Sequence, residues 1–105
     1  MSYEVIISDK AQADLREIFA YIAYGLQSRI NATRQIDRIE KEIISLSEMP
    51  ERYKRYNREP WSSRNTHWVT VDHFCVFYQV DQSSGKVHVL RILFGGRDIE
   101  AELGE

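Results

Sequence analysis

The sequence lacks several features that would assign it directly to a secreted or membrane-bound class of protein. Among its 105 residues there is one cysteine, Cys75, which excludes an internal disulfide and is typical of a reducing cytosol. No apolar run approaches the roughly 18–20 residues that cross a membrane. The opening stretch, "MSYEVIISDK", is too short and too acidic for a signal peptide. We therefore expect a cytoplasmic protein with no membrane partner.

Cofactor signatures are missing as well. The sequence has no cysteine–histidine cluster at zinc spacing and no glycine-rich phosphate loop of the Walker type. His67, His73 and His88 fall in strand-like segments without nearby metal-binding partners. We predict neither a metal site nor a bound cofactor.

The chain does have enough material for one hydrophobic core. A length of 105 residues, with 43% hydrophobic and 29% charged residues, is ordinary for a globular domain. We expect residues 1–105 to form a single domain.

The net charge of −2 is unevenly distributed. Segment 52–64, "RYKRYNREPWSSR", carries five cations against one carboxylate, so its local charge is +4 and the rest of the chain carries −6. A basic segment in an acidic protein favours a local anionic partner.

Hydrophobic periodicity predicts one strand and two helices in the first half. Alternation over 3–8 indicates a strand. A helix then begins at Ser8 or Asp9 and runs to a turn near 25–28, with an apolar stripe that leaves Asp14 facing water. The second helix begins at 28–31, and Pro50 ends it near 48–49.

The second half predicts three strands after a loop over 51–65. They cover 67–71, 73–80 and 86–94, and the last is almost continuously apolar, which indicates a central strand covered on both faces. We predict an α+β fold of order β-α-α-β-β-β, with a helical hairpin on one face of a small antiparallel sheet. The first strand lies at an edge or beside the fourth. The opposite face and the basic loop remain free to bind a partner.

Four segments together, "DKAQADLREIFAYI", "IISLSEMP", "FCVFYQVD" and "VHVLRILFGGRDIEAEL", resemble toxins of the RelE/ParE superfamily. These proteins are the toxin halves of bacterial type II toxin–antitoxin modules. The resemblance covers essentially the whole chain and implies the same α+β fold. It also implies a cognate antitoxin as partner, which would bury apolar surface that the free toxin exposes.

The superfamily contains two very different activities. RelE-like members are ribosome-dependent endoribonucleases that cut mRNA, whereas ParE-like members inhibit DNA gyrase without breaking bonds. The resemblance therefore implies either gyrase or the ribosome with its mRNA as target, and only the site can decide between them.

The resemblance carries over one RelE-like catalytic residue directly. Arg97 follows the last strand, where the family places a phosphate-binding arginine. The family's other arginine falls on Cys75, its late tyrosine falls near Leu103, and its lysine pair falls in "THWVTV". Because these residues cannot perform the same chemistry, gyrase inhibition is slightly favoured and the ribonuclease is the alternative.

Other residues could replace the missing groups. Arg64 could contact a phosphate, and His67 could act as acid or base near neutral pH, so both join Arg97 as catalytic candidates. Aromatic and basic side chains of the loop could bind nucleic acid or a protein partner by stacking and charge. These binding candidates are Arg52, Lys54, Arg55, Arg58, Trp61 and Trp68. The competing interpretation is that the histidine and tryptophans pack, and that the cations are solvated.

Overall fold

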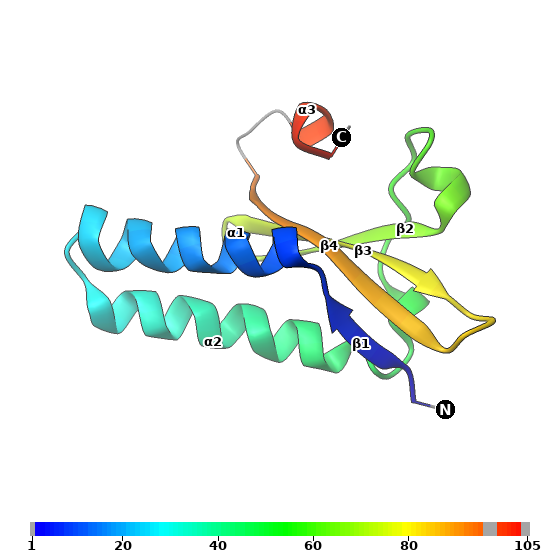
Figure 1. The fold of residues 1–105 in the computed structure, drawn as a ribbon, viewed down its shortest axis with the longest axis horizontal. Coiled ribbons are helices and arrows are strands. Elements are labelled where there is room, and N and C mark those ends of the chain that lie inside the picture. The colour runs from blue at the N-terminus through cyan, green and yellow to red at the C-terminus, as the bar shows by residue number, and fades with distance from the viewer. Residues whose placement is uncertain (1, 96–98, 104–105) are drawn as a thin grey trace.

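The structure is a computed structural model that describes residues 2–95 and 99–103. Strand β1 (Glu4–Ile7) leads into α1 (Asp9–Ala20), whose last turn continues as a π-helix over Tyr21–Gly25, and then into α2 (Arg29–Ser45). Strands β2 (Thr66–Val71), β3 (Phe74–Asp81) and β4 (Lys86–Phe94) follow, and α3 (Ile99–Leu103) closes the chain (Figure 1). This order confirms the predicted α+β fold.

The four strands form one sheet in the order β1-β4-β3-β2. Strands β2, β3 and β4 are an antiparallel meander, as predicted, and β1 lies beside β4. The prediction of an antiparallel sheet is wrong for this one pair, because β1 runs parallel to β4. Alternating apolar residues fix which face of a strand is buried, but they do not fix the direction of the strand.

Side chains and backbone turns set the helix ends. Ser8 caps α1, because its Oγ accepts a hydrogen bond from the Ala11 amide at 3.0 Å, and Ser28 caps α2 in the same way. The Gln12 side chain in the first turn of α1 donates to the carbonyl of Ile7 at 3.0 Å. Helix α2 ends at Ser45, before the predicted 48–49. The backbone amides that follow it donate to the carbonyl three residues earlier instead of four, so the α-helical pattern stops there.

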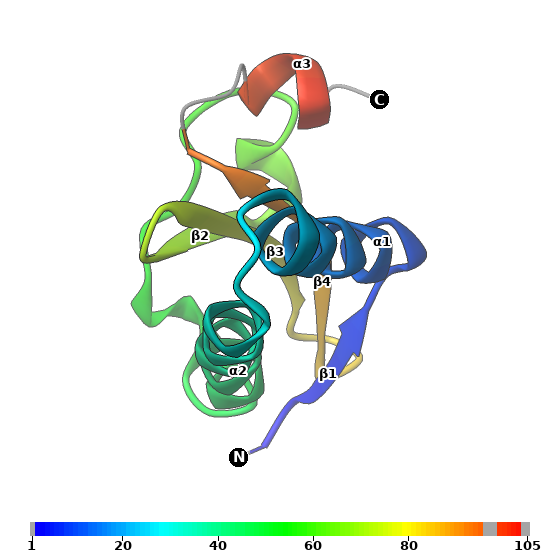
Figure 2. The same ribbon diagram turned by 90° about the vertical axis from the view of Figure 1, so that its left-hand side faces the viewer.

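The helical hairpin covers one face of the sheet and makes the larger core. Figure 2, which looks along the two helices, shows α3 on the far side of the sheet from α2. The tip of the hairpin extends well beyond the end of the sheet (Figure 1). The buried residues of this larger core are Ala11, Ile18, Ile39, Ile43, Leu46, Val69, Val76, Tyr78, Val80, Val87, Val89 and Ile92.

The opposite face of the sheet is not free, which corrects the prediction. Cys75, Phe77, Leu93 and Leu103 form a second buried cluster there. Loop and α3 side chains pack against it, namely Tyr56, Trp61, Trp68 and Ile99. Strand β3 is therefore apolar on both faces, because each face has its own core to fill.

A bulge in β4 explains its almost continuous apolar run. Val89 pairs with Tyr78 and Arg91 pairs with Phe77, so Leu90 is an extra residue on β4. Before the bulge, the β4 side chains that face the helical hairpin are at odd positions, Val87 and Val89. After it they are at even positions, beginning with Ile92.

A partly buried ion pair joins three elements at this bulge. Arg91 donates from Nε and Nη2 to both oxygens of Asp14 on α1, at 2.8 and 2.9 Å. Its Nη1 donates to the carbonyl of Glu102 on α3 at 3.0 Å. The hydrogen bonds to Asp14 raise the pKa of Arg91 above its usual value. Asp14 is only 8% exposed, so the prediction that it faces water is wrong.

We predict that Asp14→Asn lowers the free energy of unfolding by about 3 kcal/mol, the lower end of the range for a buried pair, because it removes the bidentate partner of the partly buried Arg91 guanidinium. Urea denaturation would measure the loss. The matched control is Asp37→Asn on the exposed face of α2, for which we expect a change within about 0.5 kcal/mol. Replacing both partners with leucine should cost less than Asp14→Asn alone, and a larger loss in the double variant would contradict this account.

We also predict that Cys75 is unreactive in the folded protein. Burial raises the pKa of its thiol, so it stays protonated near pH 8, where only the thiolate attacks a disulfide reagent. A chromogenic disulfide such as DTNB should therefore react much more slowly with the native protein than with the protein in urea. Equal rates in both states would contradict the closed second cluster.

Candidate functional site

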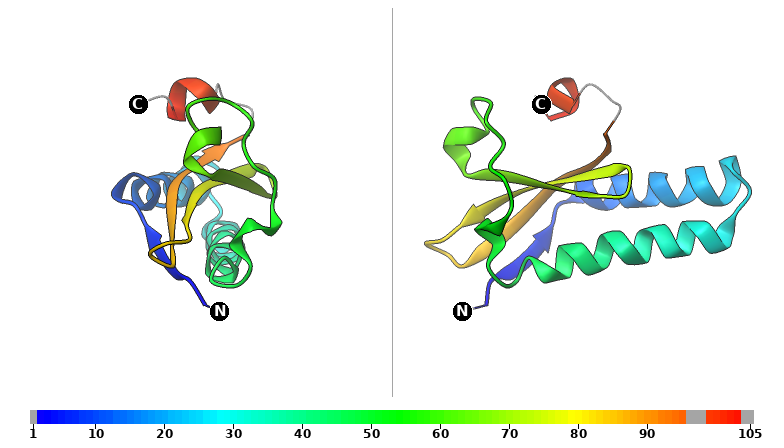
Figure 3. Two further views of the ribbon diagram at one scale, coloured as in Figure 1. Left: turned by 90° about the vertical axis from the view of Figure 1, so that its right-hand side faces the viewer. Right: turned by 180° about the vertical axis from the view of Figure 1, so that it is seen from behind.

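The basic segment is held against the sheet rather than projecting into solvent. Residues 54–56 run along the outer edge of β2: the Tyr56 amide donates to the Thr66 carbonyl at 2.8 Å, and the Trp68 amide donates to the Lys54 carbonyl at 3.1 Å. Figure 3 shows the whole connection from α2 to β2 rising beside the sheet. The expectation of an irregular loop over 51–65 therefore needs correction, because it contains two short 3-10 turns, Pro50–Arg52 and Ser62–Arg64.

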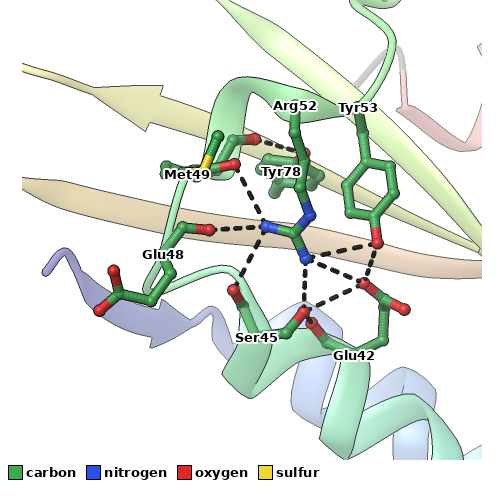
Figure 4. Close-up of polar contacts among 8 residues, drawn as sticks. Glu42, Ser45, Glu48, Met49, Arg52, Tyr53 and Tyr78 are labelled. Carbon is green, nitrogen blue, oxygen red and sulfur yellow. Dashed lines mark hydrogen bonds and ion pairs between the residues drawn. The ribbon is translucent and has the colours of Figure 1, made fainter.

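Arg52 is used to close the end of α2. Its guanidinium donates to the carbonyls of Glu48 at 2.6 Å and Met49 at 3.2 Å, and to Ser45 Oγ at 2.8 Å (Figure 4). It also lies 3.5 Å from a carboxylate oxygen of Glu42. A cation is favourable at this place because the last carbonyls of a helix carry partial negative charge. The geometry therefore gives Arg52 a structural role.

Tyr53 extends this contact network. Its hydroxyl donates to Glu42 at 2.6 Å, which raises the pKa of Tyr53, and its ring lies 4.5 Å below the Arg52 guanidinium (Figure 4). Arg52, Tyr53 and Glu42 thus fix the start of the basic segment on α2.

His67 is buried, with 3% of its surface exposed. Its Nδ1 lies 2.9 Å from the Tyr53 carbonyl and its Nε2 lies 3.0 Å from Asn65 Oδ1. Its ring stacks on Tyr78 at 5.6 Å. Both ring nitrogens are bound to the protein, so the structure gives His67 a packing position and leaves it no contact with a substrate.

The tryptophans pack around the second cluster. Trp68 stacks on Phe77, with 6.2 Å between ring centroids, and Trp61 meets Tyr56 edge to face at 5.7 Å. Both tryptophans keep part of their surface exposed. Their predicted role in binding stays a prediction, restricted to the ring surface that packing leaves open.

The remaining cations of the segment are exposed. Arg55 donates from Nη1 to the Ser62 carbonyl at 3.1 Å, whereas Lys54, Arg58 and Arg64 lie at the surface. Arg97 falls outside the described residues, so its catalytic role stays a prediction.

The structure brings Arg64 together with two cations distant in sequence. Lys10 at the start of α1, Arg64 and Arg91 line one pocket of about 280 Å³ beside α3, with Trp61 at its wall. We call it the Lys10–Arg64 pocket. Sequence reasoning missed Lys10, because a lysine in the first turn of a helix reads as a solvated residue.

Two of the positions on which the resemblance places other RelE-like catalytic residues are buried and apolar. Cys75 is 5% exposed and Leu103 is 9% exposed, and both belong to the second cluster. Trp68 of "THWVTV" packs against the same cluster.

A second, larger concavity lies where the hairpin extends past the sheet. This hairpin groove has a volume of about 930 Å³. Its apolar lining includes Tyr21, Leu26 and Phe94, which are 63%, 57% and 48% exposed. Arg34 and Arg38 line the α2 side. Large exposed apolar surface of this kind marks an interaction site.

Within residues 2–95 and 99–103, no three histidine, cysteine, aspartate or glutamate side chains gather so that they could hold a metal ion. None of the helices described is long and apolar enough to cross a membrane.

Comparison with known proteins agrees with the fold. The chromosomal ParDE system from P. aeruginosa has 19% identity and a TM-score of 0.74, over 89% of this chain and 96% of that one. The RelBE2 toxin–antitoxin complex from Mycobacterium tuberculosis has 20% identity and a TM-score of 0.68, over 90% and 92%. The isolated E. coli RelE toxin has 16% identity and a TM-score of 0.60, over 96% and 94%. Similarity at these identities shows a shared fold.

Sequence comparison shows the family. No curated protein matches the chain. The family model described as the ParE toxin of the type II toxin–antitoxin system parDE matches residues 5–99, which is nearly the whole length. This match confirms the resemblance to the RelE/ParE superfamily, and the chain belongs to the ParE toxin family as the toxin component of a type II toxin–antitoxin module.

Proposed function

We propose that this toxin inhibits DNA gyrase in the cytoplasm by binding it, without catalysing a reaction. The observation that carries the proposal is the closed second face of the sheet. Where RelE-like enzymes carry an arginine and a tyrosine, this chain has Cys75 and Leu103, both buried in an apolar cluster. Cleavage of RNA needs groups that move protons and stabilise a phosphorane. The buried His67 does not supply them, because both its nitrogens are already bound.

A second candidate function is ribosome-dependent cleavage of mRNA. It is favoured by the Lys10–Arg64 pocket, whose cations suit an RNA phosphate. Arg97 would have to supply most of the remaining chemistry. This candidate ranks second, because Cys75 and Leu103 stand where RelE-like enzymes carry other catalytic side chains, and both are buried in the apolar second cluster.

The partner that neutralises the toxin is, in this proposal, its cognate antitoxin, and the hairpin groove is where it binds. The groove is mainly apolar, with Ile18, Ile22 and Phe74 in its lining. On its α2 side, Arg38 is joined to Asp72 by an exposed ion pair of 2.7 Å, which an incoming carboxylate can share at little cost. These features fit an amphipathic antitoxin segment with apolar side chains and a few carboxylates.

We predict that the purified protein inhibits supercoiling by gyrase and leaves mRNA on programmed ribosomes uncut. Inhibition should be lost when the cognate antitoxin is added in equimolar amount, which controls for nonspecific effects. Gel analysis of plasmid supercoiling and toeprinting of mRNA would measure the two activities in parallel. Cleavage of mRNA together with full gyrase activity would overturn the gyrase proposal in favour of the ribonuclease.

We predict that Leu26→Glu weakens antitoxin binding about 10–100-fold, the loss expected when a buried leucine contact is replaced by a charge. The folded toxin should keep its stability, because Leu26 is 57% exposed. Calorimetric titration with the antitoxin would measure the dissociation constant. The matched control is Ile44→Glu, since Ile44 is 68% exposed on α2 and lies outside the groove. Equal weakening by both substitutions, or by neither, would contradict this binding site.

A further inference from the structure

The Lys10–Arg64 pocket collects positive charge from three distant parts of the chain. Lys10 comes from α1, Arg64 from the second 3-10 turn and Arg91 from β4. Among the lining residues one carboxylate, that of Glu102, opposes three cations. A concave site with excess positive charge and apolar walls focuses its field on an anion.

The three cations differ in how far their hydrogen-bond donors are already used within the protein. Arg91 is a fixed charge, because its guanidinium is already bound to Asp14 and to the Glu102 carbonyl. Lys10 and Arg64 are exposed, and within the described part of the chain no hydrogen bond or ion pair involves their side chains. Arg91 thus forms an ion-paired floor of the pocket, and Lys10 and Arg64 are the two donors that remain for a ligand oxygen.

The walls of the pocket indicate what kind of anion it suits. Trp61 lines it beside Arg64, and Tyr56 fixes the indole ring edge-on at 5.7 Å. Gln79 adds an amide, which donates to Thr66 at 3.2 Å. An aromatic face next to cations is the arrangement by which proteins hold single-stranded nucleic acid, with the base on the ring and the phosphate on the cations.

The size of the pocket limits the ligand to one unit of such a strand. Its volume of about 280 Å³ lies just below the range of small-molecule sites, which begins at about 300 Å³. We propose that the Lys10–Arg64 pocket binds one nucleotide of a single-stranded nucleic acid, with Lys10 and Arg64 on its phosphate and Trp61 on its base. This site goes beyond gyrase inhibition, and it does not depend on whether the toxin cuts RNA.

Glu102 makes the proposal more specific. Its carboxylate lies 3.7 Å from Arg91 Nη2, at the rim of the pocket, and repels an incoming phosphate. Neutralising this carboxylate should therefore strengthen binding, whereas substitutions that merely disturb a fold weaken it.

The test is fluorescence anisotropy with labelled single-stranded RNA and DNA oligonucleotides of one sequence. We expect Lys10→Gln/Arg64→Gln to weaken binding about 10-fold or more and to reduce the slope of log K against log salt by about 0.7, the change for one phosphate contact on a single strand. The matched control, Arg29→Gln/Lys41→Gln, removes the same charge from exposed positions on α2 outside both pockets and should change affinity less than about 2-fold. Glu102→Gln should bind more tightly than the parent.

The oligonucleotide arms identify the ligand. Binding of RNA, DNA or both, with the expected dependence on Lys10 and Arg64, supports the proposal and shows which sugar the pocket accepts. Polyglutamate of similar length is the competing class of polyanion. Binding of polyglutamate with the same dependence, equal losses in the two double variants, or no binding of either strand by the parent would overturn the proposal. Circular dichroism of each variant would confirm that the comparison is between folded proteins.

Discussion

The ion pair between Asp14 and Arg91 is the interaction on which the arrangement of this toxin depends. Strand β1 pairs with β4 only as far as Val89, and among residues 2–95 and 99–103 no strand pairs with this edge of β4 beyond that point. Asp14 takes the place of that strand, because its Oδ2 also accepts a hydrogen bond from the Ile92 amide at 2.9 Å. One carboxylate thus satisfies a strand edge and a guanidinium together. Such a pair is tolerated in a core because its hydrogen bonds offset the cost of desolvation.

The same pair connects the two sides of the molecule. Asp14 belongs to α1 in the larger core, while Arg91 reaches the Glu102 carbonyl on α3, which covers the second cluster. The surfaces proposed for function lie on either side of it. The hairpin groove is wide and apolar and suits a protein segment. The Lys10–Arg64 pocket is small and cationic and suits a phosphate. A toxin that must recognise both an antitoxin and a cellular target can use such separate sites.

Much of the fold was predictable from the sequence, because apolar periodicity reports burial directly. Strand β4 was predicted as 86–94 and observed as Lys86–Phe94. Asp14 was missed although a signal existed: it lies three residues after Ala11 and four before Ile18, on the apolar stripe itself. A carboxylate on such a stripe and an arginine within an apolar strand predict each other as partners. The pocket had no signal of this kind, because Lys10 and Arg64 are 54 positions apart and meet only through the tertiary fold.

The segment that lies along β2 has a consequence for how these molecules behave in a crowded solution. An uncovered outer strand offers its amides and carbonyls to any extended chain, and sheets of neighbouring molecules can join through it. Here the backbone of Lys54 and Tyr56 already occupies the first half of that margin. This pairing hinders the joining of sheets from neighbouring molecules at this edge. The arginines and the lysine of the same segment add electrostatic repulsion between copies.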